Sequence, residues 1–183
     1  MTTRRPPPVI SAVYLSRVTA FYLDRHFTTS GHLRRLLMTR VTRAVAHHGT
    51  DPREAEVLVD AEIDRLNQLG ALDDRRFAVD KAQSLRRRGS STAKIRSALH
   101  SKRLSSAAVD AALAEIKAEE PEVDAEWVAA CTWARKRRLG PWRMAASNLE
   151  RRRAELSKMG RAGFSYDIAR RIVDADDPSA LER

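Results

Sequence analysis

Hydrophobic positions recur every three or four residues along most of the chain. Ala55, Val59, Ile63 and Leu66 follow one another at intervals of four, four and three residues, and the same spacing returns in segment 109–116. This spacing places apolar side chains on one face of an α-helix. We find no alternating run of strand length. The pattern predicts an all-α protein.

Proline and glycine mark the ends of the predicted helices. Pro52, Pro121 and Pro141 stand where a helix can begin, because a proline in the first turn loses no helical hydrogen bond. Gly49 and Gly89 stand where a helix can end. The helices are expected at roughly 11–26, 30–47, 51–69, 74–88, 91–102, 105–118, 122–138, 142–158 and 165–174.

Charge and local motifs repeat along the chain. Basic and acidic blocks alternate three times, with net charges of +7, −6, +9, −6, +9 and −3 for residues 1–50, 51–74, 75–103, 104–127, 128–171 and 172–183. Thr50, Ser105 and Ser165 each stand in the N-cap region of a predicted third helix. Segment 30–37 also resembles segment 92–99.

This period predicts three tandem three-helix repeats. About 50 residues bury too little surface for robust independent stability, so such units stack on their neighbours. We therefore expect an elongated, curved array. Its parts are a flexible Pro-rich tail at 1–10, repeats at 11–72, 73–120 and 121–176, and a C-terminal tail at 177–183.

Composition narrows the class of protein. The chain has 183 residues, of which 43% are hydrophobic and 32% charged, which excludes a disordered or fibrous chain. The longest uncharged stretch, residues 6–16, is shorter than the roughly 20 apolar residues of a transmembrane helix. The single cysteine, Cys131, cannot form an internal disulfide. We expect a cytoplasmic monomer that does not bind membranes.

The sequence offers no reaction to assign. It lacks a phosphate-binding GxxxxGK[ST] loop, a Gly-rich dinucleotide loop and an HExxH motif. Cys131 lies in an apolar run typical of core packing, and His47 and His48 suit the negative end of a helix. The carboxylates of segment 54–64 lie opposite an apolar face and are typical of a solvated helix surface. We predict no enzymatic activity, no metal and no cofactor.

Arginine-rich clusters are the strongest candidates for binding. The net charge is +10, and the clusters follow the period of the predicted repeats, so a curved array would align them in a positive strip. Guanidinium groups bind phosphate and carboxylate with two hydrogen bonds at once. The partner is therefore nucleic acid, an acidic protein surface, or both. The candidate partner- and DNA-binding residues are Arg34, Arg35, Arg86, Arg87, Arg88, Arg96, Arg135, Lys136, Arg137, Arg138, Arg151 and Arg152.

Three motifs resemble those of the RecX family of regulatory proteins. Segment 69–78, LGALDDRRFA, is similar to the start of that family's second repeat. Segments 23–25 (LDR) and 33–37 (LRRLL) resemble the first repeat. Segment 161–167, RAGFSYD, resembles the signature of the last helix of the third repeat. The resemblance extends over roughly residues 12–173.

The resemblance implies three tandem three-helix repeats and no enzymatic activity. It also implies binding to the RecA recombinase filament on DNA, with restraint of ATP hydrolysis and strand exchange in recombination and DNA repair. Two departures from the family pattern stand out. His47 and His48 precede Gly49 where a plainer basic turn is expected, and Ala162 replaces an arginine often found beside the Gly-Phe pair.

Two other functions remain open from the sequence. A sequence-nonspecific DNA-binding protein would affect a filament by competing for single- or double-stranded DNA. An enzyme acting on nucleic acid would need a metal-binding carboxylate cluster facing the basic strip. For the regulator, changing Arg86, Arg87 and Arg88 to glutamate is expected to weaken inhibition and leave the helical content unchanged.

Overall fold

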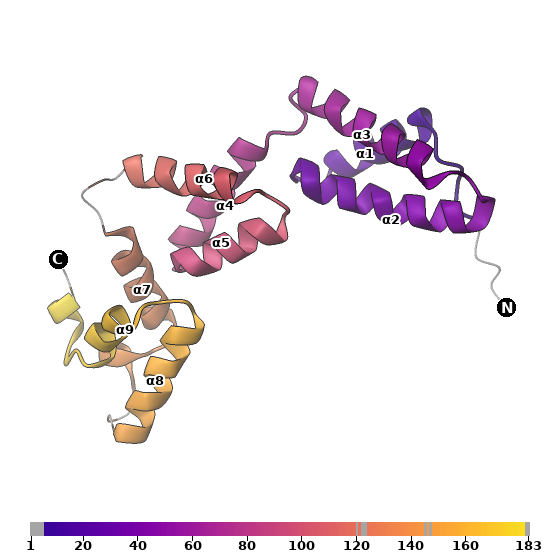
Figure 1. Ribbon diagram of the computed structural model, residues 1–183. Helices are drawn as coiled ribbons and strands as arrows, with labels where there is room; N and C mark the ends of the chain where they lie inside the picture. The colour runs from indigo at the N-terminus through magenta and orange to yellow at the C-terminus, as the bar shows by residue number, and fades with distance from the viewer. Residues whose placement is uncertain (1–5, 120, 122–123, 145, 147, 182–183) are drawn as a thin grey trace. The chain divides into compact units, whose positions relative to one another are not determined.

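The chain is helical in all the parts that the structure describes. The computed structural model describes residues 6–181 except 120, 122, 123, 145 and 147, and among these residues it contains no strand (Figure 1). The prediction of an all-α protein is confirmed. The α-helices are α1 (Ala12–Leu23), α2 (Ser30–His48), α3 (Pro52–Gln68), α4 (Asp74–Arg87), α5 (Thr92–Ser101), α6 (Ser106–Glu119), α7 (Ala125–Lys136), α8 (Leu149–Arg161) and α9 (Tyr166–Val173), with short 3₁₀ turns η1 (Gly140–Trp142) and η2 (Pro178–Leu181).

Short polar side chains define where several helices begin. The Thr29 hydroxyl accepts a hydrogen bond from the His32 amide at the start of α2, and Ser165 does the same for Ile168 in α9. Each cap satisfies an amide that has no partner within its helix. For α3 the cap is Asp51 rather than the neighbouring Thr50. At the other end of α2, Gly49 has a φ of +68°, the left-handed conformation that ends many helices.

The eighth helix begins later than the position of Pro141 predicts. We expected it over 142–158, but it spans Leu149–Arg161 and is capped by Asn148. The buried carboxylate of Glu155 holds two residues that precede the helix. This carboxylate accepts hydrogen bonds from the Gly140 amide at 3.1 Å and from the Arg143 guanidinium at 2.9 Å. Those bonds hold Gly140, in η1, and Arg143 outside α8, so the predicted start at residue 142 is wrong.

The described chain forms two compact units. The first consists of the residues up to Phe77 together with Lys102–Ser105, and the second of Ala78–Ser101 together with the residues from Ser106 onward. In the first unit, α2 and α3 pack along one another and α1 packs against α3. Its core contains Leu15, Leu33, Leu37, Val41, Ala55, Val59, Ile63, Leu66 and Leu72. Burial of each large apolar side chain contributes about 1.5–3 kcal/mol.

The first unit also buries a carboxylate. Glu62 is 6% exposed, and it accepts hydrogen bonds from the Thr19 hydroxyl at 2.6 Å and from the Arg65 guanidinium at 2.8 Å. The Arg65 hydrogen bonds lower the pKa of Glu62, against the opposing effect of burial. A paired carboxylate of this kind fixes α1 against α3.

The core of the second unit lies among α7, α8, α9 and η1. The buried residues there are Trp127, Ala129, Ala130, Ala134, Leu139, Met159, Ala162, Phe164, Ala169, Ile172, Val173 and Leu181. Gly140 packs so closely that a Cβ added to it would lie 2.2 Å from the Ile172 carbonyl oxygen. In the same unit α5 packs against α6.

The expected tails are described only in part. Residues 1–5 and 182–183 lie outside the described residues. The Pro7 carbonyl oxygen accepts a hydrogen bond from His48 Nε2 at 2.7 Å. Leu181 is buried, and its carbonyl oxygen accepts a hydrogen bond from the Trp127 indole at 3.3 Å.

Candidate basic interface of the second unit

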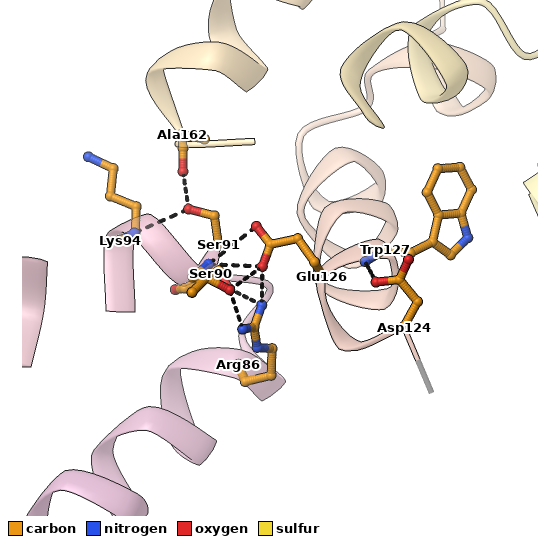
Figure 2. Close-up of polar contacts among 9 residues, drawn as sticks. Arg86, Ser90, Ser91, Lys94, Asp124, Glu126, Trp127 and Ala162 are labelled. Atoms are coloured by element: carbon orange, nitrogen blue, oxygen red, sulfur yellow. Dashed lines mark hydrogen bonds and ion pairs between the residues drawn. The ribbon is translucent and has the colours of Figure 1, made fainter. Parts of the chain in front are cut away.

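The end of α4 is tied to the start of α7 by an ion pair (Figure 2). The Arg86 guanidinium donates to Glu126 Oε2 at 2.7 Å and to the Thr92 hydroxyl at 2.7 Å. Glu126 also accepts a hydrogen bond from the Thr92 amide at 2.9 Å. The Arg86 side chain is only 17% exposed. Its donors are therefore used within the chain, where they hold the α4–α5 turn against α7.

The same turn is fixed to the loop between α8 and α9. The Ser91 hydroxyl donates to the Ala162 carbonyl oxygen at 2.6 Å and accepts from the Lys94 amide at 3.2 Å (Figure 2). Gly163 follows with a φ of +88°, and a Cβ added there would lie 2.6 Å from Ser91 Oγ. The RAGFSYD motif thus supplies a carbonyl and a glycine that let two turns meet. Ala162 is itself buried.

A matching pair of contacts occurs in the first unit. The Thr29 hydroxyl donates to the Lys102 carbonyl oxygen, and the Ser30 amide donates to Asp74 Oδ1 at 2.8 Å. Here a hydroxyl again bonds a distant loop carbonyl while the next amide bonds a carboxylate. We did not predict these contacts from the sequence. The signal was present in the matching triplets 28–30 (TTS) and 90–92 (SST).

Two of the predicted basic clusters meet on the surface of the second unit. Gly89, with a φ of +86°, brings the α4–α5 turn against α7, since a Cβ added there would lie 2.9 Å from the Trp133 amide nitrogen. Lys136 Nζ donates to the Arg88 carbonyl oxygen at 3.2 Å. The C-terminal ends of α4 and α7 are therefore adjacent, although Arg88 and Lys136 are 48 residues apart in sequence.

The exposed cations at this junction form one surface. We call it the α4–α7 basic surface, and its residues are Arg87, Arg88, Arg135, Lys136, Arg137 and Arg138. Among the described residues, the guanidinium groups of Arg87, Arg88 and Arg135 have no hydrogen-bond or ion-pair partner. Both clusters stand at helix C-termini, whose negative dipole ends stabilise cations. Their charge is available to an anionic partner.

Two members of this surface are oriented by neighbouring side chains. Arg137 lies over the Trp133 ring, 4.7 Å from its centroid, and Arg138 donates to Met144 Sδ at 2.8 Å. Cation–π contact leaves the guanidinium edge free to donate hydrogen bonds. The Arg138 backbone has a φ of +56°, an uncommon conformation for a residue with a side chain.

Two other predicted arginines are held in ion pairs. Arg34 donates to Asp60 at 2.6 Å and to Glu56 at 2.5 Å, which joins α2 to α3. Hydrogen bonding to Asp60 raises the pKa of Arg34, and the same contact lowers the pKa of Asp60. Arg152 makes a two-point pair with Asp174, with distances of 2.6 and 2.7 Å. These contacts fasten α8 to the end of α9.

The remaining predicted residues differ in their surroundings. Arg96 pairs with Asp110 and so links α5 to α6. The Arg151 guanidinium donates to the Ala146 carbonyl oxygen. Arg35 is exposed on α2 in the first unit. The structure thus brings six of the twelve candidates together on the α4–α7 basic surface and uses four in internal ion pairs.

The described residues contain no grouping of three or more His, Cys, Asp or Glu side chains arranged to hold a metal ion. Burial raises the pKa of the Cys131 thiol, which is half-buried in the second unit. Within the described chain, no helix combines the length and the apolar character needed to span a bilayer.

Comparison with known proteins identifies the family. No protein-family model matches the chain. The regulatory protein RecX of Myxococcus xanthus is 37% identical over 171 residues, which cover 93% of this chain and 89% of that protein. The chain belongs to the RecX family. The regulatory protein RecX of Agrobacterium fabrum is 28% identical over 159 residues, or 86% of this RecX-family chain and 81% of that protein. The family expected from the three motifs is confirmed.

Proposed function

We propose that this RecX-family protein binds a RecA recombinase filament on DNA and inhibits its ATP hydrolysis and strand exchange. It does so as a regulator without enzymatic activity, in the cytoplasm and as a monomer. The α4–α7 basic surface makes the electrostatic contact with the filament. Arg87, Arg88 and Arg135 contribute most, because their guanidinium groups are not used elsewhere in the described chain.

The meeting of two clusters at one junction is the observation that carries this proposal. Lys136 bonds the Arg88 carbonyl oxygen, so cations from two helices share one exposed surface. A dense positive surface attracts polyanions from a distance and accelerates association. DNA carries phosphates along its whole length, and guanidinium groups bind phosphate with two hydrogen bonds at once.

The proposal also includes three tandem three-helix repeats, at 11–72, 73–120 and 121–176. The recurring turn contacts support it. Thr29 bonds the Lys102 carbonyl oxygen as Ser91 bonds that of Ala162. In both cases the hydroxyl caps the second helix of a predicted repeat, and the carbonyl follows the second helix of the next. Such contacts between neighbouring units stabilise repeat proteins.

A second candidate function is sequence-nonspecific binding to single- and double-stranded DNA. It is favoured by the same exposed cations, because affinity for DNA depends mainly on phosphate contacts. Under this alternative the protein would inhibit a recombinase only by occupying DNA. The two functions differ in whether the recombinase itself contributes to binding.

The test is to titrate the protein into a RecA recombinase that hydrolyses ATP on single-stranded DNA. We expect inhibition at far fewer copies of the protein than of recombinase subunits, unrelieved by excess DNA. Inhibition that needs stoichiometric protein and disappears when DNA is added would favour competition for DNA. An unchanged rate of hydrolysis would contradict both functions.

A further inference from the structure

A second basic patch lies at the start of α2 in the first unit. The bond from the Thr29 hydroxyl to the Lys102 carbonyl oxygen docks the α5–α6 turn on the first turn of this helix. Gly31 permits close approach, because a Cβ added there would lie 2.7 Å from the Arg103 Cβ. We call the resulting group the α2 basic patch, and its members are His32, Arg35, Lys102 and Arg103.

Arg103 occupies a backbone conformation that suits glycine. Its φ is +64°, whereas glycines hold the turns that follow α2 and α8, with φ of +68° at Gly49 and +88° at Gly163. A residue with a side chain is strained in this conformation, at a cost of about 1–2 kcal/mol. The Arg103 side chain is exposed, so burial of apolar area does not offset that cost. The strain at Arg103 is therefore a cost that a function of its charge would explain.

The electrostatic surroundings of the patch are unfavourable in the free protein. The positive end of the α2 dipole lies here, and cations near a helix N-terminus are destabilising. The first turn of α2 contains no acidic residue. Asp74, the carboxylate that reaches this end, is already bonded to the Ser30 amide. Among the described residues, Arg35 and Arg103 have no ion-pair partner. A bound anion would remove this repulsion.

The pKa of His32 also reflects the excess of positive charge in the patch. Its Nδ1 is buried and has no hydrogen-bond partner within the described part of the chain. Burial lowers the pKa of His32, and the charges of Lys102, Arg35 and Arg103 lower it further. The imidazole is therefore neutral near pH 7. An anion among these cations would offset their charge and favour protonation of the ring.

We infer that the α2 basic patch binds phosphate groups of a nucleic-acid backbone and that His32 takes up a proton on binding. This inference deepens the proposed function and rests on its assumption that the protein works on DNA. A nucleic acid fits better than an acidic protein surface, because α2 carries no acidic residue over its 19 residues and continues the patch with exposed Arg40 and Arg43. Such an unbroken run suits a polymer with regularly spaced anions.

The variant Arg103→Gly tests the patch without weakening the fold. Glycine relieves the strained backbone, so we expect the thermal midpoint to stay the same or rise. Affinity for a short oligodeoxythymidylate should fall about 3- to 10-fold, with the slope of log affinity against log salt smaller by about 0.7 for one lost phosphate contact. The control is Arg53→Ala, which removes one exposed charge from α3 and should change neither quantity.

NMR titration of the His32 ring tests whether the ring takes up a proton on binding. We expect its titration midpoint to rise in saturating oligonucleotide, and binding to strengthen as the pH falls from 7.5 to 5.5 in the wild type but not in His32→Gln. An unchanged midpoint, equal affinities of Arg103→Gly and Arg53→Ala, or a wild type that does not bind DNA would overturn the inference. If Arg103→Gly weakened binding to polyglutamate but not to the oligonucleotide, the inference would be overturned in favour of an acidic protein as the partner. No recombinase is present, so failure here is distinct from failure of filament inhibition.

Discussion

Arginines next to one another in this sequence have different roles. Arg86 donates to Glu126 and Thr92 and is largely buried, whereas Arg87 and Arg88 are exposed at the end of the same helix. A glutamate at position 86 would face Glu126 and destabilise the turn. Changing all three arginines to glutamate, as considered from the sequence, would therefore combine a loss of binding with a loss of structure. Reversing the charges of Arg87 and Arg88 alone leaves the ion pair between Arg86 and Glu126 intact.

The buried carboxylate of Glu62 predicts how stability responds to acid. Because Arg65 and Thr19 hold its pKa below the usual range, the folded state binds a proton less readily than the unfolded chain. The stabilisation is therefore complete above about pH 5 and is lost as the pH falls through the lowered pKa. We expect Glu62→Gln to reduce the free energy of unfolding by about 2 kcal/mol at pH 7, and the difference from wild type to shrink toward pH 3.

Urea unfolding at several pH values measures this effect. The control is Glu54→Gln, which changes an exposed carboxylate on the same helix and should alter stability little. A deficit of Glu62→Gln that is equal at pH 7 and pH 3 would contradict a role for the ionised carboxylate.

On the scale of the elements, the turns that join helices are the most sensitive to substitution. Gly163 has a φ of +88° and lies against the Ser91 hydroxyl, so Gly163→Ala should cost about 2–4 kcal/mol through strain and overlap. Gly160 offers a matched control three residues earlier in α8, where an added Cβ meets no atom within 4 Å. There alanine should stabilise by about 0.5–1 kcal/mol. Equal stabilities of the two variants in urea would show that the turn contact contributes nothing.

The helices were predictable because hydrophobic spacing and capping residues are local signals. The late start of α8 was not, since it depends on a buried contact between Glu155 and Gly140. The pairing of Arg86 with Glu126 was also hidden, because it joins residues 40 positions apart. Clusters of arginine could be found from sequence, but which members remain exposed depends on carboxylates brought in from other helices.

On the scale of the whole molecule, each of the two units carries a basic surface. The α4–α7 basic surface has its cations at helix C-termini, where the dipole stabilises them in the free protein. The α2 basic patch has its cations at a helix N-terminus, where the positive end of the dipole opposes them in the free protein. We therefore propose that the first surface steers the protein toward a polyanion and that the second responds when phosphate is bound.

We propose that exposed arginines of the second unit carry inhibition of the recombinase. The most direct test measures ATP hydrolysis by a RecA recombinase on single-stranded DNA with the variant R87E/R88E. The control R17E/R53E makes the same change of charge at two exposed positions of the first unit. We predict that R87E/R88E needs at least about 10-fold more protein for half inhibition, with unchanged helical content, while the control inhibits like the wild type. Full inhibition by R87E/R88E would show that this surface does not carry inhibition.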